Sequence, residues 1–127
     1  MIREFVKGSK QRLSDHFDTS QFDCHCMRDD CRVTYVDMAL IDYLERKRAK
    51  WGKPIKVVSG FRCTSHNQRC GGKPGSRHLV GMAADIKVDG MTATEIARDC
   101  TDAGGLGLYP NFVHVDMRLG KSRWTEK

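Results

Sequence analysis

The sequence predicts a single α+β domain in which helices cover one face of a small, mainly antiparallel β-sheet. Three observations support this fold class. Apolar residues recur at helical spacing between residues 33 and 50, and apolar and polar residues alternate from Phe112 to Arg118. A helix-capping sequence also begins at Thr92. The chain of 127 residues is long enough for one core, so we expect one domain over residues 1–127, with residues 1–13 and 119–127 at its periphery.

The first half of the chain predicts a loop-rich entry segment followed by a helix. Phe17 and Phe22 lie in the entry segment and are expected to dock on the core. An amphipathic helix packed on the sheet is then expected from Val33 to about Lys50, because its apolar residues share one face. These residues are Val36, Ala39, Leu40, Tyr43 and Leu44. The sequence Trp51-Gly52-Lys53-Pro54 ends this helix.

Two strands separated by a loop are predicted in the middle of the chain. Residues 55–58 favour a short buried strand. Residues 83–88 favour another, which places Asp85 on one face and directs Ala84, Ile86 and Val88 toward the core. Residues 63–77, rich in Ser, Asn and Gly, predict a long loop that can wrap a substrate cleft.

The C-terminal third predicts a helix and a β-hairpin. Residues 92–95 form a capping box, so a helix is expected that runs to about Ala103 and stops at Gly104-Gly105. Residues 106–109 and the following strand then favour a hairpin. The polar tail, residues 121–127, is expected to fray.

Two short clusters carry the chemistry. Residues 76–85 read Ser-Arg-His-Leu-Val-Gly-Met-Ala-Ala-Asp, and His114-Val115-Asp116 follows about thirty residues later. Two imidazoles and a carboxylate can supply the three protein ligands of a catalytic zinc, with a fourth position left for water. A single histidine or aspartate is more often an ordinary surface residue, and the second cluster is what favours the metal hypothesis.

Asp116 has two possible roles. It shares a face of the predicted strand with His114, and same-face residues lie about 6.6 Å apart. If His114 holds a metal, the Asp116 carboxylate can reach a water on that metal and act as a general base. It can equally orient the imidazole of His114. The residues alone leave both roles open.

These motifs resemble those of the M15 zinc peptidases, the D-Ala-D-Ala carboxypeptidase and L-alanyl-D-glutamate endopeptidase group, which shares its fold with the hedgehog signalling domain. Residues 76–85 fit the signature S-x-H-x-x-G-x-A-x-D. Residues 112–116 are similar to the strand that carries the third ligand, and residues 58–62 are similar to the S-G-[YF]-R segment. Including Asn67, the resemblance covers roughly residues 14–118.

The resemblance implies a zinc cleft on the open face of the sheet, with one ion held by His78, Asp85 and His114. It also implies that Arg62 stabilises the oxyanion formed when water attacks a peptide carbonyl, although a structural ion pair is the other interpretation of this arginine. Ser76 and Asn67, which lie in or between the same motifs, are assigned to substrate binding.

The sequence departs from the family pattern at the general base. Many members carry Glu or Asp three residues before the last histidine, or His two residues before it. Here Asn111 and Phe112 occupy those positions, and neither side chain can accept a proton. Asp116 is therefore the predicted catalytic base. The same departure favours an alternative, a non-catalytic zinc-binding interaction module of this fold.

The six cysteines suggest a second metal site. Cys24, Cys26 and Cys31 are close enough in sequence to bind a structural zinc, with His25 as a possible fourth ligand. The alternative is free buried thiols, because cysteine packs well as a small hydrophobe. Cys63, Cys70 and Cys100 have no evident partner in the sequence.

Charge and composition restrict the partners. The net charge of +6 and pI of about 9.1 draw the protein toward polyanions. The basic residues are scattered without interleaved aromatic residues, so we expect no nucleic-acid partner, although a nucleic-acid-binding protein with a cysteine-rich zinc site is a third hypothesis. No apolar run approaches the length of a membrane span. We expect a monomer that does not insert into membranes.

The functional expectation is zinc-dependent hydrolysis of peptide bonds in the stem peptide of bacterial peptidoglycan, by a phage or prophage endolysin. The first ten residues contain no apolar core of signal-peptide length. We therefore expect synthesis in the cytoplasm and action on the cell wall or periplasm after the inner membrane is breached.

Overall fold

The computed structural model describes residues 1–126. It is a mixed α+β fold, as the sequence predicts. In chain order the elements are β1 (Ile2–Val6), η1 (Thr19–Phe22), β2 (Val33–Asp37), α1 (Met38–Trp51), β3 (Lys56–Ser59), α2 (Thr64–Arg69), η2 (Arg77–Val80), β4 (Ala83–Lys87), α3 (Ala93–Arg98), β5 (Gly105–Leu108), β6 (Val113–Asp116) and β7 (Ser122–Thr125), where η denotes a 3₁₀ turn.

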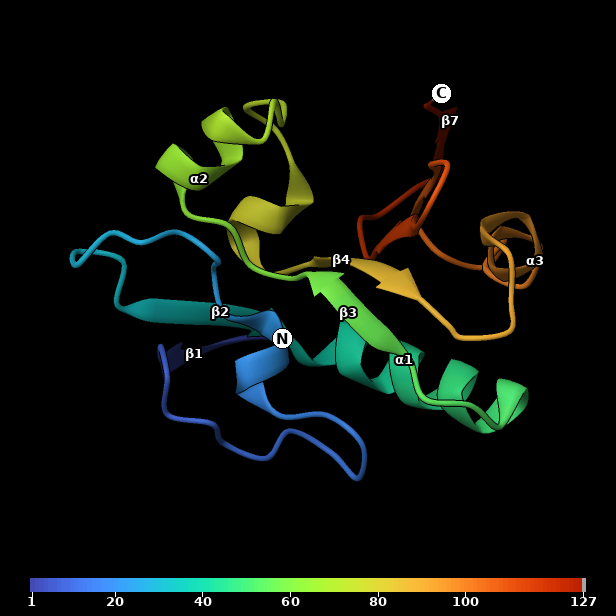
Figure 1. The fold of residues 1–127 in the computed structure, drawn as a ribbon, viewed down its shortest axis with the longest axis horizontal. Helices are drawn as coiled ribbons and strands as arrows, with labels where there is room; N and C mark the ends of the chain where they lie inside the picture. The colour runs from blue at the N-terminus through green and yellow to red at the C-terminus, as the bar shows by residue number, and fades with distance from the viewer. Residues whose placement is uncertain (127) are drawn as a thin grey trace.

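The strands form two sheets (Figure 1). The larger has the order β3-β4-β6-β5-β7, and its pairs are antiparallel except for the parallel pair β5–β7. The predicted hairpin is the antiparallel pair β5–β6. The smaller sheet pairs β1 with β2 in antiparallel fashion.

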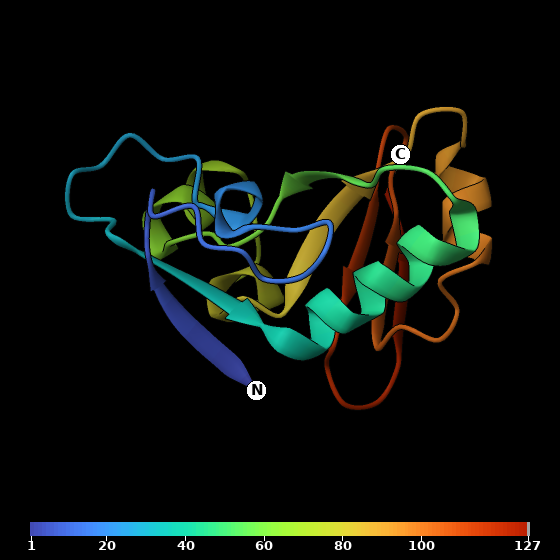
Figure 2. The ribbon, with the colours of Figure 1, turned by 90° about the horizontal axis from the view of Figure 1, so that it is seen from below.

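The core lies between the larger sheet and α1, which crosses in front of the sheet in Figure 2. Alternation along β4 and β6 directs Ile86, Val113 and Val115 into this core, where all three are fully buried. Phe17 and Phe22 dock there as predicted, each only 1% exposed. The opposite sides of β4 and β6 carry Asp85, His114 and Asp116, so the core holds these polar residues on rigid strands.

The predicted helix at residues 33–50 begins later than expected. Residues 33–37 pair with β1, and the helix starts at Met38. The Asp37 carboxylate accepts a hydrogen bond from the backbone N–H of Ala39 and so caps the first turn. At the other end, Gly52 adopts a left-handed conformation (φ 63°) and donates to the carbonyl of Arg48, as the Gly-Lys-Pro sequence predicts.

Three other expectations were wrong. The segment predicted as a loop, residues 63–77, contains α2 and the first residue of η2. Helix α3 ends at Arg98, five residues before Ala103, and turns complete the connection. The tail expected to fray forms β7, because the exposed edge of β5 offers it backbone partners. Lys127, the last residue of that tail, lies outside the described residues.

Within residues 1–126, none of the helices has both the length and the apolar character required to cross a membrane.

Candidate metal centre

Strand register brings two of the predicted ligands together. In the antiparallel pair β4–β6, Asp85 lies directly opposite His114, and Ala83 lies opposite Asp116. Directly paired residues on one face of a sheet have Cβ atoms about 4.5–5.5 Å apart. The two side chains are therefore neighbours although 29 positions separate them in sequence.

The third predicted ligand, His78, is placed by η2. The hydroxyl of Ser76 caps this turn by accepting from the backbone N–H of His78 at 3.2 Å. Gly81 ends the turn with a φ of 78°, and a Cβ at this position would overlap the carbonyl of Tyr35. The serine and the glycine of the S-x-H-x-x-G motif thus start and end the turn that aims His78 at the sheet.

The three side chains converge on one point. Oδ1 of Asp85 lies 3.2 Å from Nε2 of His78 and 3.1 Å from Nδ1 of His114. All three residues are buried, and their potential ligand atoms lie within 4.8 Å of one another. We refer to His78, Asp85 and His114 as the histidine centre.

Hydrogen bonds on the far sides of the rings orient both imidazoles. Nδ1 of His78 lies 2.7 Å from the carbonyl oxygen of Gly60, and Nε2 of His114 lies 2.7 Å from Oδ2 of Asp116. A carbonyl and a carboxylate only accept, so these two nitrogens carry the protons. In a neutral imidazole the other nitrogen then has a lone pair, and both lone pairs face Asp85.

This donor set fits a zinc ion. Two lone pairs and a carboxylate oxygen in contact repel one another unless a proton or a cation lies between them. A tetrahedral zinc with ligand distances of about 2.0–2.1 Å separates its N and O ligands by about 3.3 Å. The observed separations of 3.1 and 3.2 Å are close to that value.

The pKa values reflect the same arrangement. Burial acts to raise the pKa of Asp85, but the contacts with His114 and His78 hold it well below its usual range. Burial acts to lower the pKa of His114, but hydrogen bonds to Asp116 and Asp85 raise it above its usual value. The histidine centre therefore attracts positive charge, and a metal ion bound there competes with a proton on His114.

Asp116 is fully buried, and both of its oxygens are engaged. Oδ2 accepts from Nε2 of His114 and Nη2 of Arg118, each at 2.7 Å. Oδ1 accepts from the backbone N–H groups of Gly105 and Arg118 and from Nε of Arg118. A side chain at Gly105 would overlap the carboxylate. Of the two roles that the sequence leaves open, these contacts favour orientation of His114.

Arg62 lies on the other side of Asp85. Its Nη2 donates to Oδ2 of Asp85 at 3.0 Å, its Nε to the hydroxyl of Ser59, and its Nη1 to Oδ1 of Asn67 at 3.4 Å. A guanidinium carries five N–H donors, so two of them remain for a ligand. Arg62 both holds Asp85 and keeps hydrogen-bonding capacity beside the histidine centre.

The two residues predicted to bind substrate make structural contacts. Ser76 caps η2, as described above. Asn67 is buried, donates to the carbonyl of Lys73 at 2.9 Å and accepts from Arg62. A side chain at Gly72 would overlap the Asn67 amide. Asn67 therefore fixes both the loop after α2 and the guanidinium of Arg62.

Trp124 borders the centre and Arg118 holds Asp116 behind it, and neither residue was assigned a role from the sequence. Trp124 lies on β7 beside Gly107, and its ring centroid is 5.0 Å from that of His114. A side chain at Gly107 would overlap the indole, so the glycine creates the space for it. Gly105 and Gly107, two positions apart on one face of β5, could have indicated a large neighbour such as Trp124, because small residues on one face of a strand leave room for large side chains.

Comparison with known proteins supports the motif assignment. The sequence profile of a family described as Peptidase M15 matches residues 15–116. This range includes Arg62, the histidine centre and Asp116. A search of curated proteins found no match.

Proposed function

Because the chain belongs to the peptidase M15 family and is therefore a metallopeptidase, we propose that it cleaves the stem peptide of bacterial peptidoglycan, as a phage or prophage endolysin. The observation that carries the proposal is the preorganised three-ligand centre with Arg62 beside it. The net charge of +6 is consistent with approach to an anionic cell wall or outer membrane.

Each residue has a defined part in this proposal. His78, Asp85 and His114 hold zinc, which when bound supplies a Lewis acid for polarising a peptide carbonyl and activating water. The carbonyl of Gly60 and the carboxylate of Asp116 keep the two imidazoles in the tautomers that expose a lone pair to the metal.

Arg62 acts on the substrate. Three of its donors are held by Ser59, Asn67 and Asp85, so the guanidinium is fixed in position before substrate arrives. Its two remaining N–H groups can donate to the carbonyl oxygen as negative charge develops there. A donor that is already fixed pays little reorganisation cost, which is why such groups stabilise transition states effectively.

Mass spectrometry of purified peptidoglycan fragments tests the proposal. We expect zinc-loaded protein to convert them into two smaller products whose masses identify the bond that is cut. His78→Ala should abolish cleavage, whereas Cys70→Ser, at an exposed cysteine outside the histidine centre, should leave it intact. Intact fragments after incubation with zinc-loaded native protein would refute this substrate assignment.

A second function is a zinc-binding interaction module without catalytic activity. The observation that favours it is the saturation of both Asp116 oxygens, together with Asn111 and Phe112 at the usual base positions. This alternative predicts full zinc occupancy with no cleavage of peptidoglycan or of any other peptide. The same mass-spectrometric experiment therefore separates the two functions when zinc content is measured in parallel.

A further inference from the structure

Four cysteines form a second cluster outside the histidine centre. Cys24, Cys26 and Cys31 lie in the connection between η1 and β2, and Cys63 directly precedes α2. Their four Sγ atoms lie within 4.8 Å of one another. We call these residues the cysteine cluster. His25, which the sequence suggested as a fourth ligand, is exposed and is not part of it.

The sulfur spacing fits a tetrahedral metal ion. Zinc with four thiolate ligands has Zn–S distances of about 2.3 Å, which places neighbouring sulfurs about 3.8 Å apart. The Sγ atoms of Cys24 and Cys63 are 3.8 Å apart. A disulfide would require about 2.05 Å, and these cysteines are not bonded to one another.

Burial raises the pKa of the Cys24 and Cys31 thiols, but donors lie beside two of the four sulfurs. The backbone N–H of Cys63 donates to Sγ of Cys24 at 3.4 Å. The ammonium group of Lys7 lies 3.7 Å from Sγ of Cys26 and 3.4 Å from its carbonyl oxygen. A nearby cation and N–H···S hydrogen bonds both stabilise negative charge on sulfur, and the thiolate is the form that binds metal.

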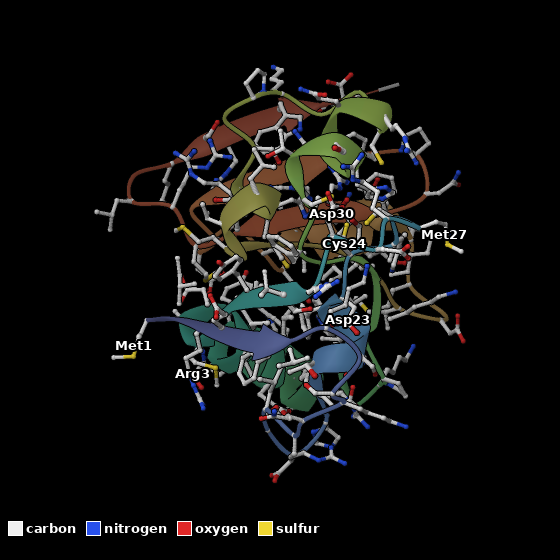
Figure 3. All side chains as sticks on the ribbon, turned by 90° about the vertical axis from the view of Figure 1, so that its left-hand side faces the viewer. Met1, Arg3, Asp23, Cys24, Met27 and Asp30 are labelled. Atoms are coloured by element: carbon white, nitrogen blue, oxygen red, sulfur yellow. The ribbon has the colours of Figure 1, made fainter. Side chains whose placement is uncertain are left out.

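The connection that carries three of the cysteines needs an anchor. Residues 23–32 contain neither helix nor strand, and Cys24 and Cys26 are the side chains of this segment that are buried. Cys24 is only 3% exposed, whereas Met27 extends outward at the edge of Figure 3 and is 92% exposed. The cysteines therefore take the place that apolar side chains usually have in anchoring a loop.

We propose that one structural zinc ion is bound by the thiolates of Cys24, Cys26, Cys31 and Cys63. Four protein ligands leave no open position, so this site holds the chain together and does not catalyse. It ties the η1–β2 connection to the residue that follows Arg62. The proposal does not rest on the peptidase function and stands or falls separately from it.

The first test is the zinc content of the purified protein, measured by inductively coupled plasma mass spectrometry. We expect two zinc ions per native chain and one in either Cys26→Ser or His78→Ala. Combining both substitutions should remove both ions. Cys70→Ser is the matched control, because Cys70 is an exposed cysteine outside the cluster, and it should retain two.

The second test covers the case in which Cys26→Ser fails to fold. Cobalt replaces zinc in thiolate sites and gives intense sulfur-to-cobalt charge-transfer absorption. This absorption should appear in the native protein and persist in His78→Ala, which leaves the cysteine cluster intact. Native protein that lacks the absorption, binds iron instead of zinc, or loses mass through disulfide formation among these cysteines would overturn the proposal. A single zinc that Cys26→Ser retains in full would also overturn it.

Discussion

Replacing Asp116 by asparagine separates the two roles of this residue, and we expect the main effect to be on zinc affinity. The carboxylate accepts five hydrogen bonds, one of them from Nε2 of His114. An asparagine amide has only one oxygen. Its NH₂ group only donates, and it would take the place of one carboxylate oxygen and face the donors that now bind that oxygen. Whichever way the amide turns, bonds from His114 and Arg118 or from Gly105 and Arg118 are lost.

The expected magnitude follows from the role of these bonds. Loss of a hydrogen-bonding partner behind a metal ligand typically lowers metal affinity about 10–100-fold, which corresponds to about 1.4–2.7 kcal/mol. A general base removed without disturbing the metal would instead lower the rate about 10²–10⁴-fold. The two roles thus predict changes in different measured quantities.

The assay is a competition titration of zinc against a chromophoric chelator, with kcat measured separately at saturating zinc. Asp42→Asn is the matched control, since it removes an equal charge from an exposed position on α1. Native zinc affinity combined with a rate loss of 10²-fold or more would show that Asp116 is the base and that our reasoning from its hydrogen bonds is wrong.

Three further outcomes are expected. Arg62→Ala should lower kcat about 10²-fold or more with a smaller change in KM. Arg62→Lys should restore activity only in part, because one ammonium group cannot make the same contacts as a guanidinium. An unchanged kcat of Arg62→Ala on peptidoglycan fragments would remove Arg62 from catalysis. Gly81→Ala should destabilise the fold by about 2 kcal/mol or more, because the new side chain overlaps β2 and the positive φ is strained. The control Gly71→Ala, also at positive φ but in open space, should cost about 1 kcal/mol. Equal midpoints of the two variants in thermal denaturation would contradict this. His78→Ala, in a chain whose cysteine cluster is also replaced by serine, should bind no zinc after dialysis, and full occupancy would place the catalytic ion elsewhere.

Local patterns predicted much of the fold because they depend on neighbours in sequence. The alternation around His114 predicted a strand with His114 and Asp116 on one face, and β6 confirms it. The capping box at Thr92 was also confirmed, since Thr92 and Glu95 exchange both hydrogen bonds. The end of α3 was predicted too late, because no strong local signal follows Arg98. The turns after this short helix depend instead on packing against β5.

The sequence by itself determined which residues could bind metal and which backbone positions required glycine or a cap, because those properties belong to side-chain chemistry and local φ and ψ. The tertiary structure decided which residues meet. Cys63 joined Cys24, Cys26 and Cys31 from a distant segment, and the tail became β7 and brought Trp124 over His114. It also decided how Asp116 is used, since the donors that occupy its oxygens include the backbone of β5. Such contacts arise from strand pairing between segments far apart in the chain, where no local pattern can specify the partner.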